Sequence, residues 1–249
     1  MNPQPDEMVT PSLPRPTHPA DAAEFLRLML QLRKDITEGR DLYHLYRNLC
    51  ALLSDYQREI AQSPAFWSLV LRGLQDSAIL RLCRVYDQES KSLSLYTFLL
   101  TVRDSPEVFQ EAEFRKRLAG NPGVEILVAY RQRLPMPQLE EDILVTSCRD
   151  PLVHKLILWR HNAIAHSGYE IAKGNRQVLD NSPFTGDDWL TLIDRSFDVL
   201  NRYVFLFDAR SYSTKLIGED DYKNLFHLMR LGLKKHDEDL DSEIRGLAQ

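Results

Sequence analysis

The chain has 249 residues, of which 43% are hydrophobic and 27% are charged, so it can bury a substantial core. Its net charge of −5 argues against a general nucleic-acid-binding protein, although residues 114–176 carry ten Lys or Arg against six Asp or Glu. No apolar run could cross a bilayer and no secretion signal opens the chain, so we expect a cytoplasmic protein without membrane contact.

The two ends of the chain differ in composition from the middle. Residues 1–20 hold six of the thirteen prolines and no apolar periodicity, which predicts a disordered leader. Residues 21–236 are expected to form a single all-helical domain, followed by an acidic tail over residues 237–249. The three cysteines show no metal-type spacing and are expected to be buried free thiols; they are Cys50, Cys83 and Cys148.

Three helices are predicted in the first third of the chain. A helix over residues 21–37 is expected to end at Gly39, and a second helix follows over residues 40–62. Ser63-Pro64 then begins a third helix, because serine caps a helix well and proline suits its first turn. This third helix is expected to end near Asp87.

The rest of the chain also follows helical periodicity. The shorter helices are expected over residues 96–102, 105–119, 124–134 and 139–148. A polar stretch over residues 173–188 predicts a flexible loop, and Thr185 or Asp187 can cap the helix after it. That helix is apolar nearly all round near its end, which indicates burial in the core or at a subunit interface. A last helix is expected over residues 220–235, and no alternating pattern predicts a sheet, so the fold class is all-α.

The stretch between the shorter helices and the polar loop predicts a central helix. Asp150 can cap it, Pro151 suits its first position and Gly168 can end it. Arg160 falls on the apolar stripe of this helix, where a charge is costly unless it is paired or faces a cleft. His166 lies roughly 120° from Arg160 around a straight helix. Arg160 must therefore lean across, or a second copy of the helix must complete the site.

Two segments resemble a known family. Arg160-His161-Asn162-Ala163-Ile164-Ala165-His166 resembles the signature of the HEPN superfamily, which is an Arg, a polar residue and a His four to six residues beyond the Arg. The third helix ends in Arg81-Leu82-Cys83-Arg84-Val85-Tyr86-Asp87 and is followed by Ser92-Leu93-Ser94-Leu95. This second segment resembles the abortive-infection AbiU-like branch of the HEPN proteins. The resemblance covers roughly residues 40–210 and implies a HEPN-like helical bundle with additional helices.

The resemblance implies a metal-independent endoribonuclease that acts in phage defence or as a toxin, with its site in a cleft between two subunits. Such cleavage needs a proton-transfer group for the 2′-hydroxyl and the leaving oxygen, and a cation for the charged phosphorane. Histidine suits the first role and arginine the second, so His166 is the candidate acid or base and Arg160 the candidate phosphate ligand. Asn162 would fix the tautomer of His166, and His161 would supply a second proton-transfer group or phosphate contact.

Arg81 and Arg84 are further candidates. In a functional interpretation one of them faces the Arg160 cleft and helps to hold phosphate. In a structural interpretation they form the polar face of an amphipathic helix, with Arg84 and Asp87 close enough for a weak surface pair.

The expected partners are RNA, a second copy of the chain and an antitoxin or regulatory protein. We expect no cofactor and no metal. A zinc site at His154, His161 and His166 is disfavoured, since their spacings of seven and five miss the usual i, i+4 pair. Two alternatives to an enzyme remain: a non-catalytic HEPN-fold module that binds RNA, nucleotide or a protein, and a helical scaffold in which Arg160 is a buried structural ion.

Overall fold

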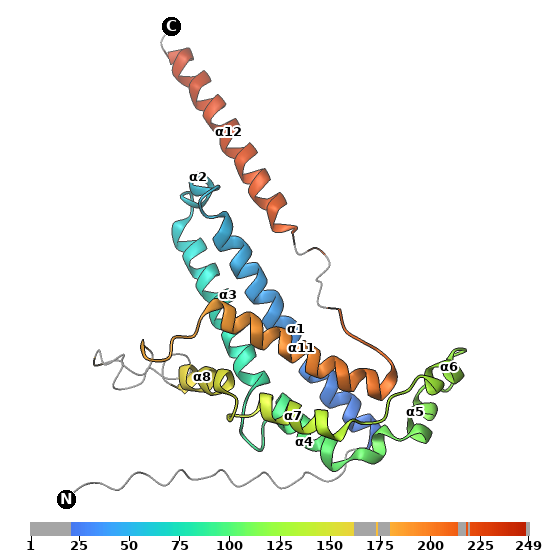
Figure 1. Ribbon diagram of the computed structural model, residues 1–249. Helices are drawn as coiled ribbons and strands as arrows, with labels where there is room; N and C mark the ends of the chain where they lie inside the picture. The colour runs from blue at the N-terminus through green and yellow to red at the C-terminus, as the bar shows by residue number, and fades with distance from the viewer. Residues whose placement is uncertain (1–20, 162–172, 174–179, 214–217, 219, 248–249) are drawn as a thin grey trace, which may run out of the picture.

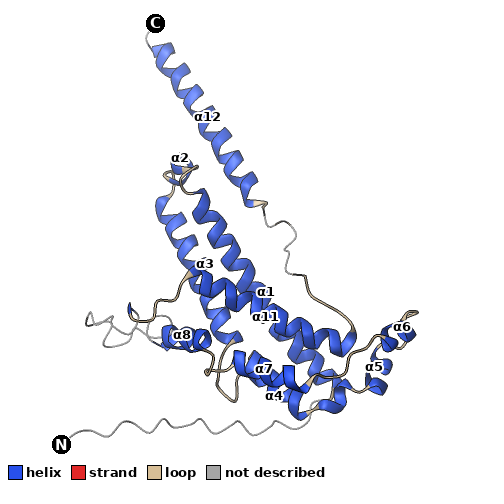
Figure 2. Cartoon of the chain, in the orientation of Figure 1, coloured by secondary structure: helices blue, strands red, loops and turns tan. Residues whose placement is uncertain are grey.

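The protein is a bundle of α-helices, seen here in a computed structural model (Figures 1 and 2). The structure describes residues 21–161, 173, 180–213, 218 and 220–247, and these residues contain no strand. The helices are α1 (Ala22–Leu52), α2 (Gln57–Ile60), α3 (Pro64–Val85), α4 (Leu95–Asp104), the 3-10 helix η1 (Pro106–Phe109), α5 (Glu111–Arg117), α6 (Val124–Ala129), α7 (Met136–Thr146), α8 (Pro151–Trp159), α11 (Gly186–Asp208) and α12 (Tyr222–Leu247). The prediction of an all-α fold without a sheet is confirmed.

The most extensive helix–helix contact in the bundle is between α1 and α3, which lie side by side (Figure 1). The prediction that Gly39 ends the first helix is wrong, because α1 continues through it as a single helix to Leu52. A Cβ atom at Gly39 would lie 3.1 Å from the Cβ of Arg81 on α3. Glycine is therefore required here by the close approach of two helices rather than by a turn.

The centre of the bundle is α11, which crosses α1 and α3 and contacts α8. Thr185 caps α11 with a hydrogen bond from the Asp188 N–H, as the sequence predicted. At the apolar end of this helix Tyr203 and Phe207 lie in the core, whereas Phe205 is 48% exposed. The ring of Phe25 on α1 packs against Phe207 at a centroid distance of 5.7 Å. Of the two predicted sites of burial for this helix, core or subunit interface, the structure shows the core.

Helices α4 and α7 pack together at one end of the bundle. The predicted helix over residues 105–119 is divided into η1 and α5 at Gln110, whose backbone is extended, and Val108 and Phe109 just before it are buried. The predicted helix over residues 124–134 is shorter than expected, since α6 ends at Ala129. Helix α7 begins at Met136, earlier than predicted, because Pro137 is tolerated in a first helical turn.

The prediction that the last helix ends near residue 235 is also wrong. Helix α12 continues to Leu247 through the acidic residues, and Lys235 pairs with Asp239 one turn along at 2.7 Å. Such i, i+4 pairs stabilise a helix whose two halves carry opposite charges. Arg58 of α2 also pairs with Asp237 at 2.6 Å, so the acidic residues help to hold α12 against the bundle.

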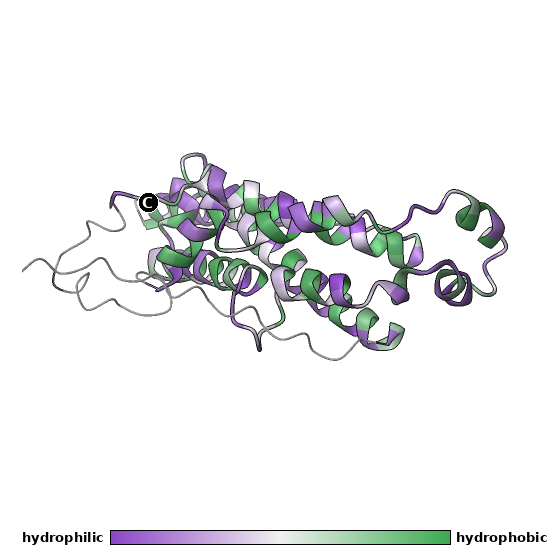
Figure 3. Cartoon of the chain, turned by 60° about the horizontal axis from the view of Figure 1, so that its bottom comes forward, coloured by the Kyte–Doolittle hydropathy of each residue, from purple (hydrophilic) through white to green (hydrophobic). Residues whose placement is uncertain are grey.

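Figure 3 shows hydrophobic and hydrophilic residues interspersed along the helices. Among the described residues, no helix combines the length and apolar character that a bilayer span requires. All three cysteines are free; Cys83 is buried, whereas Cys50 and Cys148 are only partly buried, contrary to the expectation for those two.

Candidate functional site

Helix α8 carries Arg160 directly after its last α-helical residue. Asp150 caps the helix by accepting hydrogen bonds from the Leu152 and Val153 N–H groups at 2.9 and 3.0 Å, as the sequence predicted. Arg195 of α11 pairs with the same carboxylate at 3.0 Å, which fixes the start of α8 to the centre of the bundle. At its other end, α8 widens into a π-helical turn at Arg160 and His161. Turns of this kind are frequent at functional sites.

Arg160 is paired with Asp87, which lies just after the end of α3. The Arg160 Nη1 donates to the Asp87 Oδ1 at 2.8 Å, across 73 residues of sequence. The Asp87 side chain is 13% exposed and the Arg160 side chain 29% exposed. The charge on the apolar stripe of α8 is therefore compensated by a carboxylate while its guanidinium remains accessible to solvent.

The surroundings of Asp87 keep this carboxylate ionised. Burial alone would raise its pKa, but hydrogen bonds from Arg160, the Glu89 N–H and Ser92 outweigh burial and hold the pKa of Asp87 below its ordinary value of 3.8. The N–H of Glu89 donates to Oδ1 at 3.2 Å. A carboxylate that accepts several hydrogen bonds is fixed in position, so Asp87 can orient the guanidinium of Arg160.

Gln88, the next residue, ties the same turn to the start of α8. Its Nε2 donates to the carbonyl of Thr146 at 3.1 Å, and its Oε1 accepts from the Cys148 N–H at 3.0 Å. These bonds join the turn after α3 to the connection between α7 and α8. Two adjacent side chains thus fix α8 relative to α3: Asp87 binds Arg160 at the end of α8, and Gln88 binds the segment that precedes α8.

The charges of Arg160 and Asp87 both influence the pKa of the Cys83 thiol. Burial raises the pKa of Cys83 to about 12, and the positive charge of Arg160 only partly opposes that rise. A thiol with that pKa is protonated at neutral pH and cannot serve as a nucleophile. Cys83 is therefore not a candidate for nucleophilic chemistry in this region.

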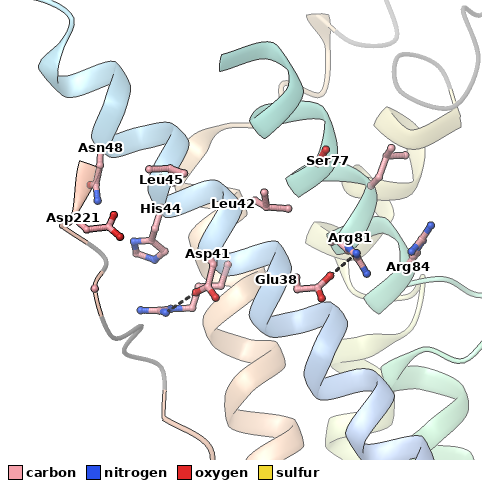
Figure 4. A pocket seen from close by; sticks show the side chains of 13 residues that line it. Glu38, Asp41, Leu42, His44, Leu45, Asn48, Ser77, Arg81, Arg84 and Asp221 are labelled. Carbon is pink, nitrogen blue, oxygen red and sulfur yellow. Dashed lines mark hydrogen bonds and ion pairs between the residues drawn. The ribbon is translucent and has the colours of Figure 1, made fainter. Parts of the chain in front are cut away.

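Arg81 and Arg84 lie at a groove between α1 and α3 of about 710 Å³, whose lining does not include Arg160 (Figure 4). Arg81 forms ion pairs with Asp35 and Glu38 of α1. Arg84 is 64% exposed and lies 3.9 Å from Asp35. The expected surface pair between Arg84 and Asp87 does not form, since Asp87 is engaged by Arg160. A phosphate-binding role for either arginine stays a prediction.

The remaining predicted site residues divide into two groups. His161 is exposed at the π-helical turn, next to Arg160. His154 is exposed on α8, as expected for a surface residue. Asn162 and His166 lie outside the described residues, so their predicted roles stay predictions.

Sequence reasoning missed the partner of Arg160. Asp87 stood in the second recognised segment, but its carboxylate was expected to meet Arg84 three residues away. The sequence did contain a signal for this pair. One family-like segment ends in a carboxylate, Asp87, and the other begins with an arginine, Arg160, that had no assigned partner. Nothing in the sequence pointed to Gln88, which is a single polar residue in a turn.

Comparison with known proteins supports this grouping of segments. The family model for AbiU2, a HEPN family, matches residues 22–226, which include both α3 and α8. No curated protein matches the chain, and no solved structure matches it. The match covers most of the chain and confirms the predicted resemblance. The chain belongs to the HEPN AbiU2 family.

Proposed function

We propose that the protein is a metal-independent endoribonuclease of HEPN type, with Arg160 and His166 as its central residues. The observation that carries the proposal is the pairing of Arg160 with Asp87. It joins the two segments that resemble the family and presents a partly exposed guanidinium at the start of the Arg-to-His motif. A guanidinium has five N–H donors, so contact with one carboxylate leaves donors for phosphate oxygens.

The reaction is an internal transesterification of RNA. A base removes the proton of a 2′-hydroxyl, whose oxygen attacks the adjacent phosphorus. The bond from phosphorus to the 5′-oxygen then breaks, and an acid protonates that oxygen, leaving a 2′,3′-cyclic phosphate. His166 is assigned to proton transfer because imidazole titrates near neutral pH, and Arg160 to stabilising the charged phosphorane. His161 and Asn162 are assigned supporting roles.

The proposal includes a cleft formed by two copies of the chain. On a straight α-helix Arg160 and His166 do not share a face, which is why a second copy was expected to complete the site. The described part of the motif, Arg160 and His161, forms a π-helical turn and is not a straight α-helix. A symmetric dimer would place one Arg160 near the His166 of its partner.

A non-catalytic binding module is the second candidate. The observation that favours it is the same ion pair, because a carboxylate at 2.8 Å competes with phosphate for the guanidinium. In that case the protein retains RNA or nucleotide without cleaving it. Action in phage defence, with an antitoxin or regulatory partner, is proposed on the family alone.

The test is cleavage of a labelled RNA pool by purified protein in EDTA. We expect 2′,3′-cyclic phosphate ends from the wild type and none from His166→Ala or Arg160→Ala. His154→Ala is the matched control, because it removes an exposed histidine from the same helix and should cleave like the wild type. No cleavage by the wild type, or equal cleavage by all four proteins, would contradict the ribonuclease proposal and favour the binding module.

A further inference from the structure

Helix α3 presents an apolar face to solvent that no described part of the chain covers. Three large side chains on it are exposed: Phe66 by 58%, Leu69 by 68% and Leu80 by 47%. Gly73 lies between them, and a Cβ atom there would meet nothing within 4 Å. At 100° per residue these four residues and the exposed Ser77 fall within about 80° of arc, so they form one continuous face.

The spacing of these five residues is symmetric about Gly73. Leu69 and Ser77 lie four residues on either side of it, and Phe66 and Leu80 lie seven residues on either side. If two α3 helices cross antiparallel at Gly73, Phe66 of one copy meets Leu80 of the other, and Leu69 meets Ser77. This is the self-complementarity that a two-fold interface requires. A glycine at the crossing point lets the two backbones approach closely.

Two charges beside this face are centred on position 74, one residue beyond Gly73. Arg72 and Asp76 are exposed on one flank of the apolar face, and no ion pair joins either to another described residue. In an antiparallel helix pair, equal flanks face each other across the two-fold axis. Arg72 of each copy then lies about 3 Å along the helix axis from Asp76 of the other, which brings two reciprocal ion pairs within reach of these side chains.

The groove between α1 and α3 adds a place for one of the large side chains. Leu80 lines it together with Leu42, Leu45 and Ser77, and its volume is about 710 Å³. Figure 4 shows Leu42 and Ser77 at this groove, with Arg81 nearby. Because Phe66 of a second copy meets Leu80, its ring would enter the groove at this point.

We propose that this face of α3 binds a second copy of the chain, antiparallel and two-fold symmetric about Gly73. The contact is separate from the cleft of the proposed function. Asp87 lies 14 residues beyond Gly73, or about 20 Å along the helix, so the two Arg160–Asp87 pairs would stand about 40 Å apart. One helix pair buries less than the roughly 800 Å² per partner of a standard interface, so the association should depend on protein concentration.

The first test introduces a cysteine at the crossing point of the full-length chain. Under mild oxidation, Gly73→Cys should form a disulfide-linked dimer rapidly, because the two introduced thiols meet on the two-fold axis. The control is Gln75→Cys, which is exposed on the same helix about 200° away from position 73. The wild type reports any background from its native cysteines. Cross-linking of Gly73→Cys no faster than that of Gln75→Cys, with both variants folded, would overturn the proposal.

The second test exchanges the flanking charges in the Gly73→Cys chain and measures the rate of cross-linking, which reports on this face and not on the cleft dimer. Arg72→Asp or Asp76→Arg alone creates two like-charge contacts and should slow cross-linking about tenfold. The double variant Arg72→Asp/Asp76→Arg restores both pairs and should cross-link like Gly73→Cys alone. A double variant as slow as the singles would contradict the antiparallel arrangement. RNA cleavage is measured on the same proteins, so failure of this interface and failure of the ribonuclease proposal are told apart.

Discussion

Two arginine–aspartate pairs in this molecule have different surroundings. Asp142 of α7 is 2% exposed and accepts from Arg202, and also from the Tyr203 hydroxyl at 2.7 Å. Asp142 and Tyr203 are buried within α7 and α11, whereas the Arg202 side chain is 35% exposed. The pair of Arg160 and Asp87 instead joins a helix end to a turn. Its arginine is 29% exposed, so the two pairs differ in the burial of the carboxylate and in their place on the helices, and not in the exposure of the arginine.

The difference separates a structural pair from a candidate functional one. Burying Asp142 without its partners would be costly, so its contacts are needed for α7 to pack on α11. Nothing in the packing of α8 requires Arg160 itself, since Val153 and Leu156 already anchor that helix in the core. A charge that the fold could omit, held in place by a fixed carboxylate, is the kind expected at a functional site.

The largest expected effect is on stability, from Asp142→Ala. The substitution leaves the buried Tyr203 hydroxyl and the Arg202 guanidinium without their acceptor. We expect the free energy of unfolding to fall by about 3 kcal/mol, as for other broken buried pairs. Urea unfolding followed by circular dichroism measures it. A loss below about 1 kcal/mol would show that solvent replaces the carboxylate and that this pair is not the structural one.

The next effect is expected from Gln88→Ala, which removes three side-chain hydrogen bonds between the turn after α3 and its surroundings. The loss in unfolding free energy should be about 1 to 2 kcal/mol. RNA cleavage should fall as well, because Asp87 next to it loses its position. Gln75→Ala is the control, since Gln75 is exposed on α3. Unchanged cleavage by Gln88→Ala would show that Arg160 does not need this turn.

A smaller effect concerns the pH dependence of the Arg160 pair. The folded pKa of Asp87 is lowered, so the pair stabilises the fold above the unfolded pKa near 3.8 and loses that contribution as pH falls through the folded pKa. Wild type should therefore lose more stability between pH 5 and about 3 than Asp87→Asn. Thermal unfolding across this range measures the difference. Parallel curves would mean that the pair contributes nothing to the fold.

The smallest effect on stability is expected from Arg84→Ala. Arg84 is 64% exposed and its nearest carboxylate lies 3.9 Å away, so the unfolding free energy should change by less than about 0.5 kcal/mol. If Arg84 holds phosphate, the variant should bind RNA more weakly, and the difference should shrink as salt rises. Fluorescence anisotropy with labelled RNA tests this, and equal binding at low salt would remove Arg84 from the RNA site.

Features of the fold that depend on neighbouring residues were predicted well from the sequence. The caps at Asp150 and Thr185 are local, because a side chain within three residues satisfies the free backbone N–H groups. Helix α3 also begins at Ser63-Pro64 as predicted, although the Ser63 side chain makes no capping hydrogen bond. Gly39 was misread because its reason is tertiary: the approach of Arg81, which is 42 residues away. The end of α12 was missed because the acidic residues after position 236 were interpreted as a tail, whereas Lys235 and Arg58 pair with them.

The candidate site was predicted in part for the same reason. The pattern around Arg160 showed an arginine where a helix should be apolar, which is visible in one segment. Its partner was not visible, because the turn that carries Asp87 is brought to α8 only by the packing of α3, α7 and α11. Spacing along the chain pairs Asp87 with Arg84; the fold pairs it with Arg160.

The most direct test compares Arg160→Gln with Arg202→Gln in one experiment, measuring the unfolding free energy and RNA cleavage of each. Arg160→Gln should lower cleavage about 100-fold or more, as for loss of a group that stabilises a transition state, and change stability by less than about 1 kcal/mol. Arg202→Gln should lower stability and, in its folded fraction, cleave like the wild type. Wild-type cleavage by Arg160→Gln, or a loss of cleavage that only follows unfolding, would contradict a functional role for Arg160.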